Sequence, residues 1–170
     1  MHLKSVLLLF ILLTCYACDE HKDIEEAHLT NWKPRQIKTL PSDSLEYGNS
    51  YLSIYSHIYS LTEHTTHNLT ATVSIRNTSN IDSLYILKAP YYNTDGVLIR
   101  NYTEKPIYVK PMETLEIVIS QIDVEGGSGA NFIFDWAIKA GTTAPIFEAV
   151  MISTSGQQGL SFTTIGTRIK

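Results

Sequence analysis

The feature that most constrains this chain is an alternation of apolar and polar residues that begins near Tyr47 and continues toward the C-terminus. The stretch NLTATVSIRN is the clearest case, because every second residue is apolar: Leu69, Ala71, Val73 and Ile75. Successive side chains point to opposite faces of a strand, so this pattern predicts β-strands with one buried face. No stretch after residue 47 has a sustained helical period, so residues 47–170 are predicted to form an all-β domain.

Turn residues separate the alternating stretches at intervals of about 8–12 residues, which is typical of sandwiches and barrels. NTDG at residues 93–96 is a strong hairpin signal, because glycine adopts positive φ without steric cost. We count about eight strands and predict an antiparallel two-sheet sandwich of the immunoglobulin-like type. A closed β-barrel is the alternative.

The N-terminus has the features of an export signal. Lys4 precedes an unbroken apolar run over residues 6–13. This run is too short to cross a membrane, which takes about 20 apolar residues. It fits the apolar centre of a secretory signal, so we predict a signal peptide over residues 1–17.

Both cysteines of the chain, Cys15 and Cys18, follow this apolar run. A cysteine in this setting resembles the bacterial lipobox, in which the thiol is acylated and the chain is cut before it. Cys18 follows the small residue Ala17, whereas Cys15 follows Thr14, so Cys18 is the predicted lipidation site and Cys15 the alternative. A disulfide between the two, or the loss of both with the signal, stays open.

Residues 18–46 are polar, contain Pro34 and Pro41, and show no strand pattern. We interpret them as a tether between a lipid anchor and the domain. These features predict a protein that is exported from the cytoplasm and lipid-anchored in the bacterial cell envelope. A secreted glycoprotein is a competing interpretation, because the triplets at Asn68, Asn77 and Asn101 match the glycan acceptor pattern.

The segment GGSGANFIFDW at residues 126–136 combines three glycines with an alternating stretch. A glycine loop that binds phosphate needs a helix behind it, so that free N–H groups and the helix dipole face the anion. Here the alternation predicts a strand, and the Gly-Lys-Ser/Thr ending of nucleotide loops is missing. We interpret the glycines as a tight connection with positive φ or a bulge. A backbone-amide site for a carboxylate or sulfate is the alternative.

Several stretches carry a resemblance when they are taken together: YSHIY, LTATVSIRNTS, YY with DG, GGSGANFIFDW, PIFEAVMI and QGLSF. The combination resembles an uncharacterised bacterial envelope family that is catalogued only as a domain of unknown function. The resemblance covers roughly residues 47–170 and leaves the tether outside. It implies a short, exported and often lipid-anchored protein. It implies no activity, and no functional residue is carried over from it.

The candidate metal ligands are His57, His64 and His67, because imidazole nitrogens of two or three such residues could hold copper or zinc. His64 and His67 flank two threonines in a predicted loop, and His57 lies in the predicted strand before it. No cysteine or close Glu–His pair completes a recognised metal pattern. Solvated loop histidines are the alternative.

No arrangement of acidic or nucleophilic residues in the sequence indicates a catalytic site. Glu148 lies among apolar residues and would need a partner such as Arg76 or Arg100, so a salt bridge that closes the sheet is the simplest interpretation. GGSGA is not the nucleophile elbow GxSxG. We therefore predict a protein that is not an enzyme and has no cofactor.

Tyrosine is abundant, with ten residues in the chain. Tyr51, Tyr55 and Tyr59 step by four, so they can share one face of a strand, whereas Tyr91 and Tyr92 must point oppositely. An exposed tyrosine row could stack on sugars or pack against a protein. Packing in the core and on the sheet faces is the alternative.

If each strand runs opposite to the strand before it, every second loop lies at the same end of the domain. The loops near residues 64–67, 93–96, 125–130 and 155–158 are then predicted to share an end, and binding residues concentrate on such loop sets. The candidate ligand-facing residues of this end are His64, His67, Asn93, Asp95, Glu125, Asn131 and Gln157.

The net charge of −4 and the lack of a basic patch argue against a nucleic-acid partner. We expect a lipid-anchored envelope protein with a non-catalytic binding or structural sandwich. Its anchor would attach it to the membrane, and a protein or glycan of the envelope would be its partner. The alternatives are a small copper- or zinc-handling protein and an enzyme that acts on glycans.

Overall fold

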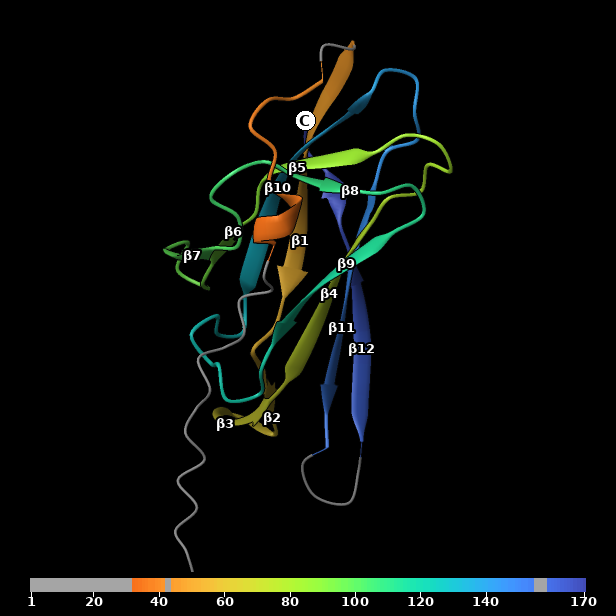
Figure 1. Cartoon of the computed structure of the whole chain (residues 1–170). Coiled ribbons are helices and arrows are strands. Elements are labelled where there is room, and N and C mark those ends of the chain that lie inside the picture. The colour runs from red at the N-terminus through yellow and green to blue at the C-terminus, as the bar shows by residue number, and fades with distance from the viewer. Residues whose placement is uncertain (1–31, 42–43, 155–158) are drawn as a thin grey trace, which may run out of the picture.

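The computed structural model describes residues 32–41, 44–154 and 159–170, and these residues form two antiparallel sheets and a hairpin (Figure 1). The seven-stranded sheet has the order β13-β1-β10-β5-β8, and β6 pairs with β10 and β7. Its strands are β13 (Thr167–Arg168), β1 (Leu45–Ile54), β10 (Ala130–Lys139), β5 (Leu84–Lys88), β8 (Ile107–Val109), β6 (Pro90–Tyr92) and β7 (Leu98–Asn101).

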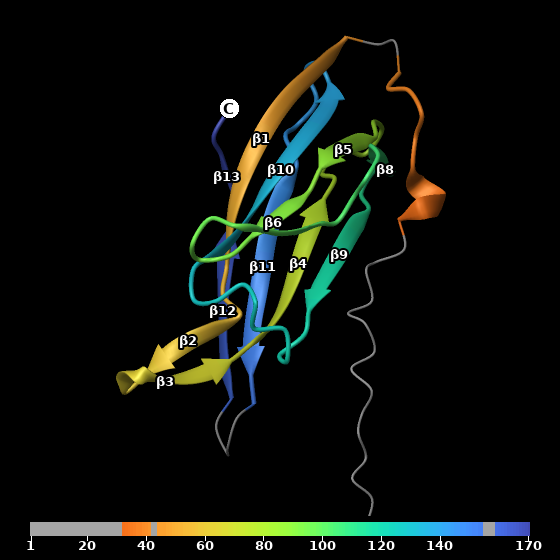
Figure 2. The same cartoon turned by 90° about the vertical axis from the view of Figure 1, so that its left-hand side faces the viewer.

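The four-stranded sheet has the order β12-β11-β4-β9, and the third element is a hairpin of β2 and β3. The strands of the sheet are β12 (Leu160–Ile165), β11 (Ile146–Ser153), β4 (Thr70–Arg76) and β9 (Thr114–Ile119). The hairpin consists of β2 (His57–Ser60) and β3 (Thr62–Asn68). Figure 2 shows the seven-stranded sheet in front of the four-stranded one.

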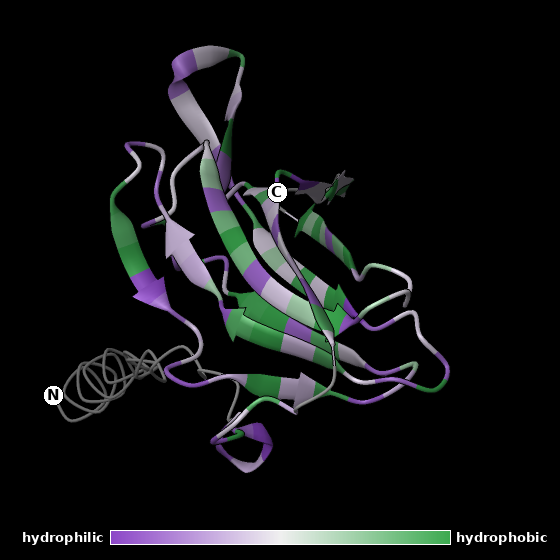
Figure 3. Cartoon of the chain, turned by 90° about the horizontal axis from the view of Figure 1, so that it is seen from above, coloured by the Kyte–Doolittle hydropathy of each residue, from purple (hydrophilic) through white to green (hydrophobic). Residues whose placement is uncertain are grey.

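The core lies between the two sheets and is built from the alternate residues that the sequence pattern indicates. Apolar and polar residues alternate along the strands in Figure 3. Stacked rings join the sheets, because Phe134 of β10 stacks on Phe147 of β11 with ring centroids 4.5 Å apart. Phe134 also stacks on Phe132 at 5.1 Å, and Phe132 stacks on Tyr91 at 4.8 Å.

The predicted all-β, antiparallel two-sheet sandwich is confirmed. Neither sheet closes on itself, so the alternative of a closed barrel is wrong. The described residues contain more than the expected eight strands, because local breaks divide long alternating stretches. Ala89 separates β5 from β6, and residues 55–56 separate β1 from β2.

The chain changes sheets at Gly166, between β12 in the four-stranded sheet and β13 in the seven-stranded sheet. The Gly166 N–H donates to the carbonyl of Phe147 at 2.7 Å. A side-chain carbon at Gly166 would lie 2.9 Å from Cβ of Phe147. Glycine is therefore the residue that lets the last strand cross so close to β11.

The N-terminal segment docks on the sandwich where β8 and β9 lie at the edges of their sheets (Figure 2). Trp32, which precedes the short 3-10 helix η1 (Lys33–Arg35), is only 4% exposed and belongs to the core cluster. Gln36 forms a β-bridge with Ile107 of β8. This part of residues 18–46 therefore differs from the expected tether, because one large apolar ring and one β-bridge fix it to the sandwich. A single ring and a single bridge leave no periodic pattern in the sequence. Residues 18–31 lie outside the described residues.

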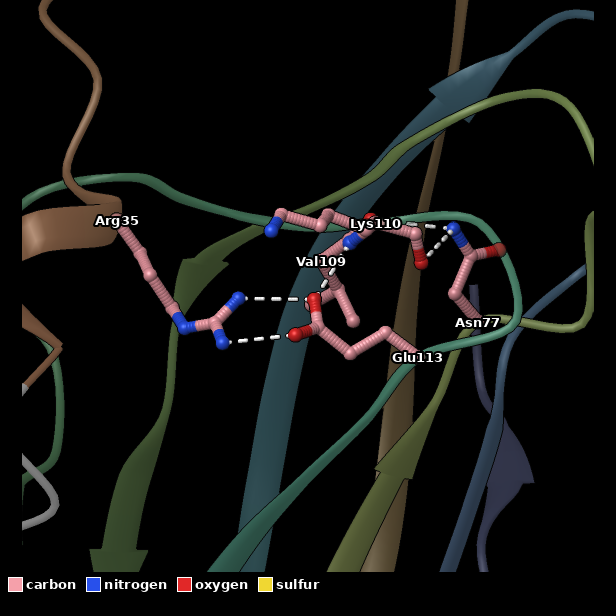
Figure 4. A network of polar contacts seen from close by, with 5 residues as sticks. All are labelled: Arg35, Asn77, Val109, Lys110 and Glu113. Carbon is pink, nitrogen blue, oxygen red and sulfur yellow. Dashed lines mark hydrogen bonds and ion pairs between the residues drawn. The ribbon is translucent and has the colours of Figure 1, made fainter.

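A polar network fixes the turn between β8 and β9, which connects the two sheets (Figure 4). The Glu113 carboxylate accepts hydrogen bonds from Arg35 and from the Lys110 N–H at 2.8 Å. The buried amide of Asn77 donates to the carbonyls of Val109 at 3.1 Å and Lys110 at 3.0 Å. This engagement of the amide argues against Asn77 as a glycan acceptor.

Candidate functional site

The structure brings the described loops of the predicted end together. The Thr94 N–H donates to the carbonyl of Gly126 at 3.0 Å, and the Ser56 N–H donates to the carbonyl of Gly127 at 2.9 Å. Ser56 precedes the β2–β3 hairpin, so the hairpin lies at this end too. Residues 155–158 lie outside the described residues, but the flanking Ser153 and Leu160 lie beside the hairpin. The loops near residues 93–96 and 125–130 and the start of the hairpin therefore lie at one end of the domain.

The glycine segment is a close-packed connection into β10. Gly127 has a φ of +75°, which an L side chain rarely adopts. A side-chain carbon at Gly126 would collide with the Tyr91 hydroxyl and would lie 2.6 Å from Oγ of Ser56. The segment leads into a strand, as expected, so the interpretation as a tight connection is confirmed.

Arg100 is the centre of a polar cluster under this connection. It forms ion pairs with Asp123 at 2.7 Å and Glu125 at 3.0 Å. Its guanidinium lies 5.9 Å from the ring centre of Tyr91. Burial raises the pKa of Tyr102 to about 12, and Arg100 opposes this shift. Because Arg100 pairs with both carboxylates, the cluster ties the β6–β7 hairpin to the segment before β10.

The sequence offered two arginines as partners for Glu148, and the structure selects one of them. Arg76 of β4 donates from Nε to the Glu148 carboxylate of β11 at 2.7 Å. The interpretation of Glu148 as a salt bridge that closes the sheet is confirmed. Arg100 instead joins the cluster above, a pairing that sequence reasoning missed.

The three candidate metal ligands do not converge. The predicted loop at residues 64–67 is part of β3, and the chain turns at Leu61, whose φ is +63°. His67 pairs with Ile58, and His57 pairs with Asn68, so the side chains of His57 and His67 lie on opposite faces of the hairpin. His64 is exposed and lies 3.6 Å from Glu63. Within the described ranges, no group of three His, Cys, Asp or Glu side chains could hold a metal ion.

The other candidate ligand-facing residues have separate surroundings. Asn93 caps its own turn, since its Oδ1 accepts from the N–H groups of Asp95 at 3.0 Å and Val97 at 2.9 Å. Asp95 is exposed, and Glu125 is held by Arg100. Asn131 lies within β10, opposite Tyr92, and Gln157 lies outside the described residues.

A shallow groove of about 370 Å³ lies between the hairpin and the ends of β11 and β12. Its lining residues are Ile58, Tyr59, Ser60, His67, Ser153, Gly159 and Leu160. His67 is the one predicted ligand-facing residue among these. Ile58 and His67 pair across the hairpin and so share one of its faces.

The expected row of Tyr51, Tyr55 and Tyr59 is wrong, because β1 ends at Ile54 and a separate strand follows. Tyr55 packs edge-on against Phe162 at 5.6 Å between ring centroids. Tyr59 lies in the hairpin. The opposite directions of Tyr91 and Tyr92 are confirmed: Tyr91 is fully buried, and Tyr92 is partly exposed.

A different set of tyrosines shares the outer face of the seven-stranded sheet. Residues paired across antiparallel strands point to the same face. Ala137 of β10 pairs with Tyr47 of β1 and with Tyr85 of β5, and Tyr85 pairs with Tyr108 of β8. Tyr51 of β1 lies on the same face, four residues beyond Tyr47. We call these four residues, Tyr47, Tyr51, Tyr85 and Tyr108, the tyrosine face.

A polar pair lies within the tyrosine face. Asn49 is between Tyr47 and Tyr51 on β1 and pairs in register with Asp135 of β10. The Asn49 amide donates to Oδ1 of Asp135. Tyr47 is 57% exposed and Tyr51 36%, so their rings reach solvent beside this pair. Local periodicity could not find the face, because its members come from three strands that are distant in sequence.

The predicted lipidation sites Cys18 and Cys15 precede the described residues. In the part of the chain that the structure describes, no helix is long and apolar enough to cross a membrane.

Comparisons with known proteins place the domain in a family but assign it no activity. Residues 47–169 match the family described as "Protein of unknown function (DUF3124)". No curated protein matches the chain. A solved structure titled "Crystal Structure of Thermotoga maritima 1070" is 10% identical, with a TM-score of 0.45. The similarity covers 71% of this chain and 92% of the Thermotoga maritima chain.

Proposed function

This chain belongs to the DUF3124 family, whose function is unknown, and we propose that it is a lipid-anchored protein of the bacterial cell envelope whose sandwich binds an envelope partner. The binding surface is the tyrosine face of the seven-stranded sheet. The protein acts by binding and not by catalysis.

The order of segments in the chain supports the anchor. An apolar run over residues 6–13 is followed by Cys18, and the domain that matches the family begins at residue 47. Acylation of Cys18 would attach the chain to a membrane surface. Stable attachment takes two acyl chains or one chain and a second signal, because one chain alone binds reversibly.

The observation that carries the proposed binding role is the exposure of aromatic rings on a face that the core does not need. The inward residues of β1 already pack in the core, whereas Tyr47 and Tyr51 point outward and are 57% and 36% exposed. A tyrosine ring offers a large apolar surface and a hydroxyl with few rotatable bonds, so it is enriched in binding surfaces.

The anchor is tested by labelling producing bacteria with a fatty-acid analogue and separating the membrane fraction. The wild-type chain should carry the label and sediment with membranes, and Cys18→Ser should lose both properties. Cys15→Ser is the matched control and should keep the label. A chain that stays unlabelled, or whose label follows Cys15, contradicts the assignment of Cys18.

The binding role is tested by thermal unfolding of the purified full chain with an envelope extract. A ligand at about 100 times its Kd adds about 2.7 kcal/mol to the free energy of unfolding, a readable shift. The wild-type chain should shift, and Tyr47→Ser with Tyr51→Ser should not. Tyr59→Ser is the matched control, because Tyr59 is 58% exposed but lies in the hairpin. An equal shift in all variants contradicts the proposed surface.

A further inference from the structure

We propose that the ligand of the tyrosine face is an uncharged polysaccharide strand, whose sugar rings stack on Tyr47, Tyr51 and Tyr85 and whose hydroxyl groups bind Asp135. This inference rests on the proposed function and specifies its partner. Four observations on the described residues support it.

The first observation is the spacing of the rings. Neighbouring strands lie about 4.8 Å apart, so Tyr47 and Tyr85, with β10 between them, start about 10 Å apart. Tyr47 and Tyr51 are four residues apart along one strand, which corresponds to about 13 Å. Such separations suit several rings of an extended chain better than one compact ligand.

The second observation is the small residue between two tyrosines. Ala137 occupies the position on β10 between Tyr47 and Tyr85, and it is buried. A larger side chain there would stand between the two rings. Alanine is small and fully buried here, so neighbouring side chains close over it and no side chain at this position projects between the two tyrosines.

The third observation is the polar pair. Asn49 donates to one oxygen of the Asp135 carboxylate. A carboxylate has two oxygens and four lone pairs, so Oδ2 can accept further hydrogen bonds from hydroxyl donors. Asp135 stands opposite Asn49 on the neighbouring strand, whereas Tyr47 pairs with Ala137 and Tyr51 pairs with Ile133, so Asp135 is the diagonal neighbour of both tyrosines. Hydroxyl groups of a sugar stacked on either tyrosine would therefore lie near it.

The chemistry of the rings fits the same ligand. The face of an aromatic ring carries negative charge density, so it attracts the weakly positive C–H groups that line one side of a sugar ring. The centre of the face carries the Asp135 carboxylate and, paired with it in register on β5, the exposed Lys88 cation. Because these two charges balance locally, the face favours an uncharged ligand over a strongly charged one.

The fourth observation is the contrast between the two outer faces of the sandwich. The outer face of the four-stranded sheet exposes the aliphatic residues Val118, Val150 and Ile152. Protein interfaces have apolar centres, so that aliphatic face suits a protein partner. The tyrosine face combines aromatic rings with a hydrogen-bonding pair, which favours a glycan.

The test is a titration of the purified full chain with defined uncharged oligosaccharides of gluco, manno and N-acetylglucosamine type, and with glycan strands released from purified envelopes. Binding is measured by calorimetry. We expect at least one of these probes to bind, and Tyr47→Ser with Tyr51→Ser to weaken that binding about tenfold or more. Asp135→Asn should weaken it less, and Tyr59→Ser should leave it unchanged. Thermal unfolding without ligand verifies that each variant is folded.

Three results would overturn the inference, and they have different consequences. If no glycan binds but the protein fraction of the envelope still stabilises the chain through Tyr47 and Tyr51, the glycan is wrong and the proposed binding face stands. If no envelope fraction stabilises the chain, both the glycan and the proposed function are wrong. Glycan binding that is lost equally in Tyr59→Ser would also overturn the placement on this face.

Discussion

Arg35 donates two parallel hydrogen bonds to Glu113, from Nη1 to Oε2 at 2.8 Å and from Nη2 to Oε1 at 2.7 Å. The bonds join the N-terminal segment to the turn that leads from β8 of one sheet to β9 of the other. Both side chains are about a quarter exposed, at 26% and 22%. Such a two-bond geometry fixes the segment more firmly than a single surface contact would.

This pair predicts a loss of stability in acid. The hydrogen bonds from Arg35 lower the pKa of Glu113. A lowered pKa in the folded state stabilises the protein above the unfolded value of about 4.3, and this stability is lost as the pH falls through the folded pKa. The free energy of unfolding measured in urea should therefore differ less between pH 7 and pH 3 for Glu113→Gln than for the wild type. Glu46→Gln is the control, because the Glu46–Arg168 pair is more exposed. An unchanged difference in Glu113→Gln would contradict the prediction.

The burial of Trp32 predicts that the stable domain begins before residue 47, where the match to the family begins. The ring is buried in the core cluster, so Trp32→Ala should lower the free energy of unfolding by about 3 kcal/mol. The nearby exposed residue gives the control, since Lys38→Ala should change it by less than about 0.5 kcal/mol. Equilibrium unfolding in urea measures both. Equal stability of the two variants would mean that the segment only rests on the sandwich.

Local alternation was sufficient to predict the strands and the inward-facing residues. In β4, Ala71, Val73 and Ile75 are buried, as the period of two requires. The same pattern placed Phe132 and Phe134 in the core. These predictions succeed because the direction of a strand side chain depends only on its position along the chain.

The candidate site was harder to predict because strand order is not encoded locally. Tyr47 and Tyr85 share a face only because β10, from far along the chain, pairs between β1 and β5. The pairing of Arg100 with Asp123 likewise depends on how the β6–β7 hairpin folds back. The break after Ile54 separated Tyr59 from Tyr51, since a change of direction at residues 55–56 leaves no compositional signal.

The close packing around Gly126 predicts that a larger residue at this position destabilises the domain, and that a second substitution restores part of the stability. The side-chain carbon of Gly126→Ala would meet the Tyr91 hydroxyl and Oγ of Ser56, so the free energy of unfolding should fall by about 1–3 kcal/mol. Tyr91→Phe removes one of the colliding atoms and should restore part of this loss in the double variant. Gly159→Ala is the control, because no atom lies within 4 Å of the added carbon. A loss that Tyr91→Phe leaves unchanged would contradict this steric account.

We expect ionisation of the buried Tyr102 hydroxyl to limit the stability of the fold at alkaline pH. Its ring packs against Phe132 at 5.4 Å between centroids, and burial raises its pKa to about 12. A raised pKa of an acid stabilises the folded state below the unfolded value of about 10, and this stability is lost as the pH rises through 12. Burial also raises the pKa of Tyr91, which acts in the same direction.

The wild-type chain should therefore lose stability between about pH 10 and pH 12, and Tyr102→Phe should lose less over that interval because phenylalanine cannot ionise. Unfolding at each pH gives the stability, and absorbance near the tyrosinate band reports ionisation. Tyr59→Phe, in the exposed hairpin, should retain the wild-type slope. If Tyr102→Phe and Tyr59→Phe lose stability equally steeply, ionisation of the buried ring does not limit the fold. Alkaline unfolding would then begin elsewhere, and the cluster around Arg100 would be only a local tie between two loops.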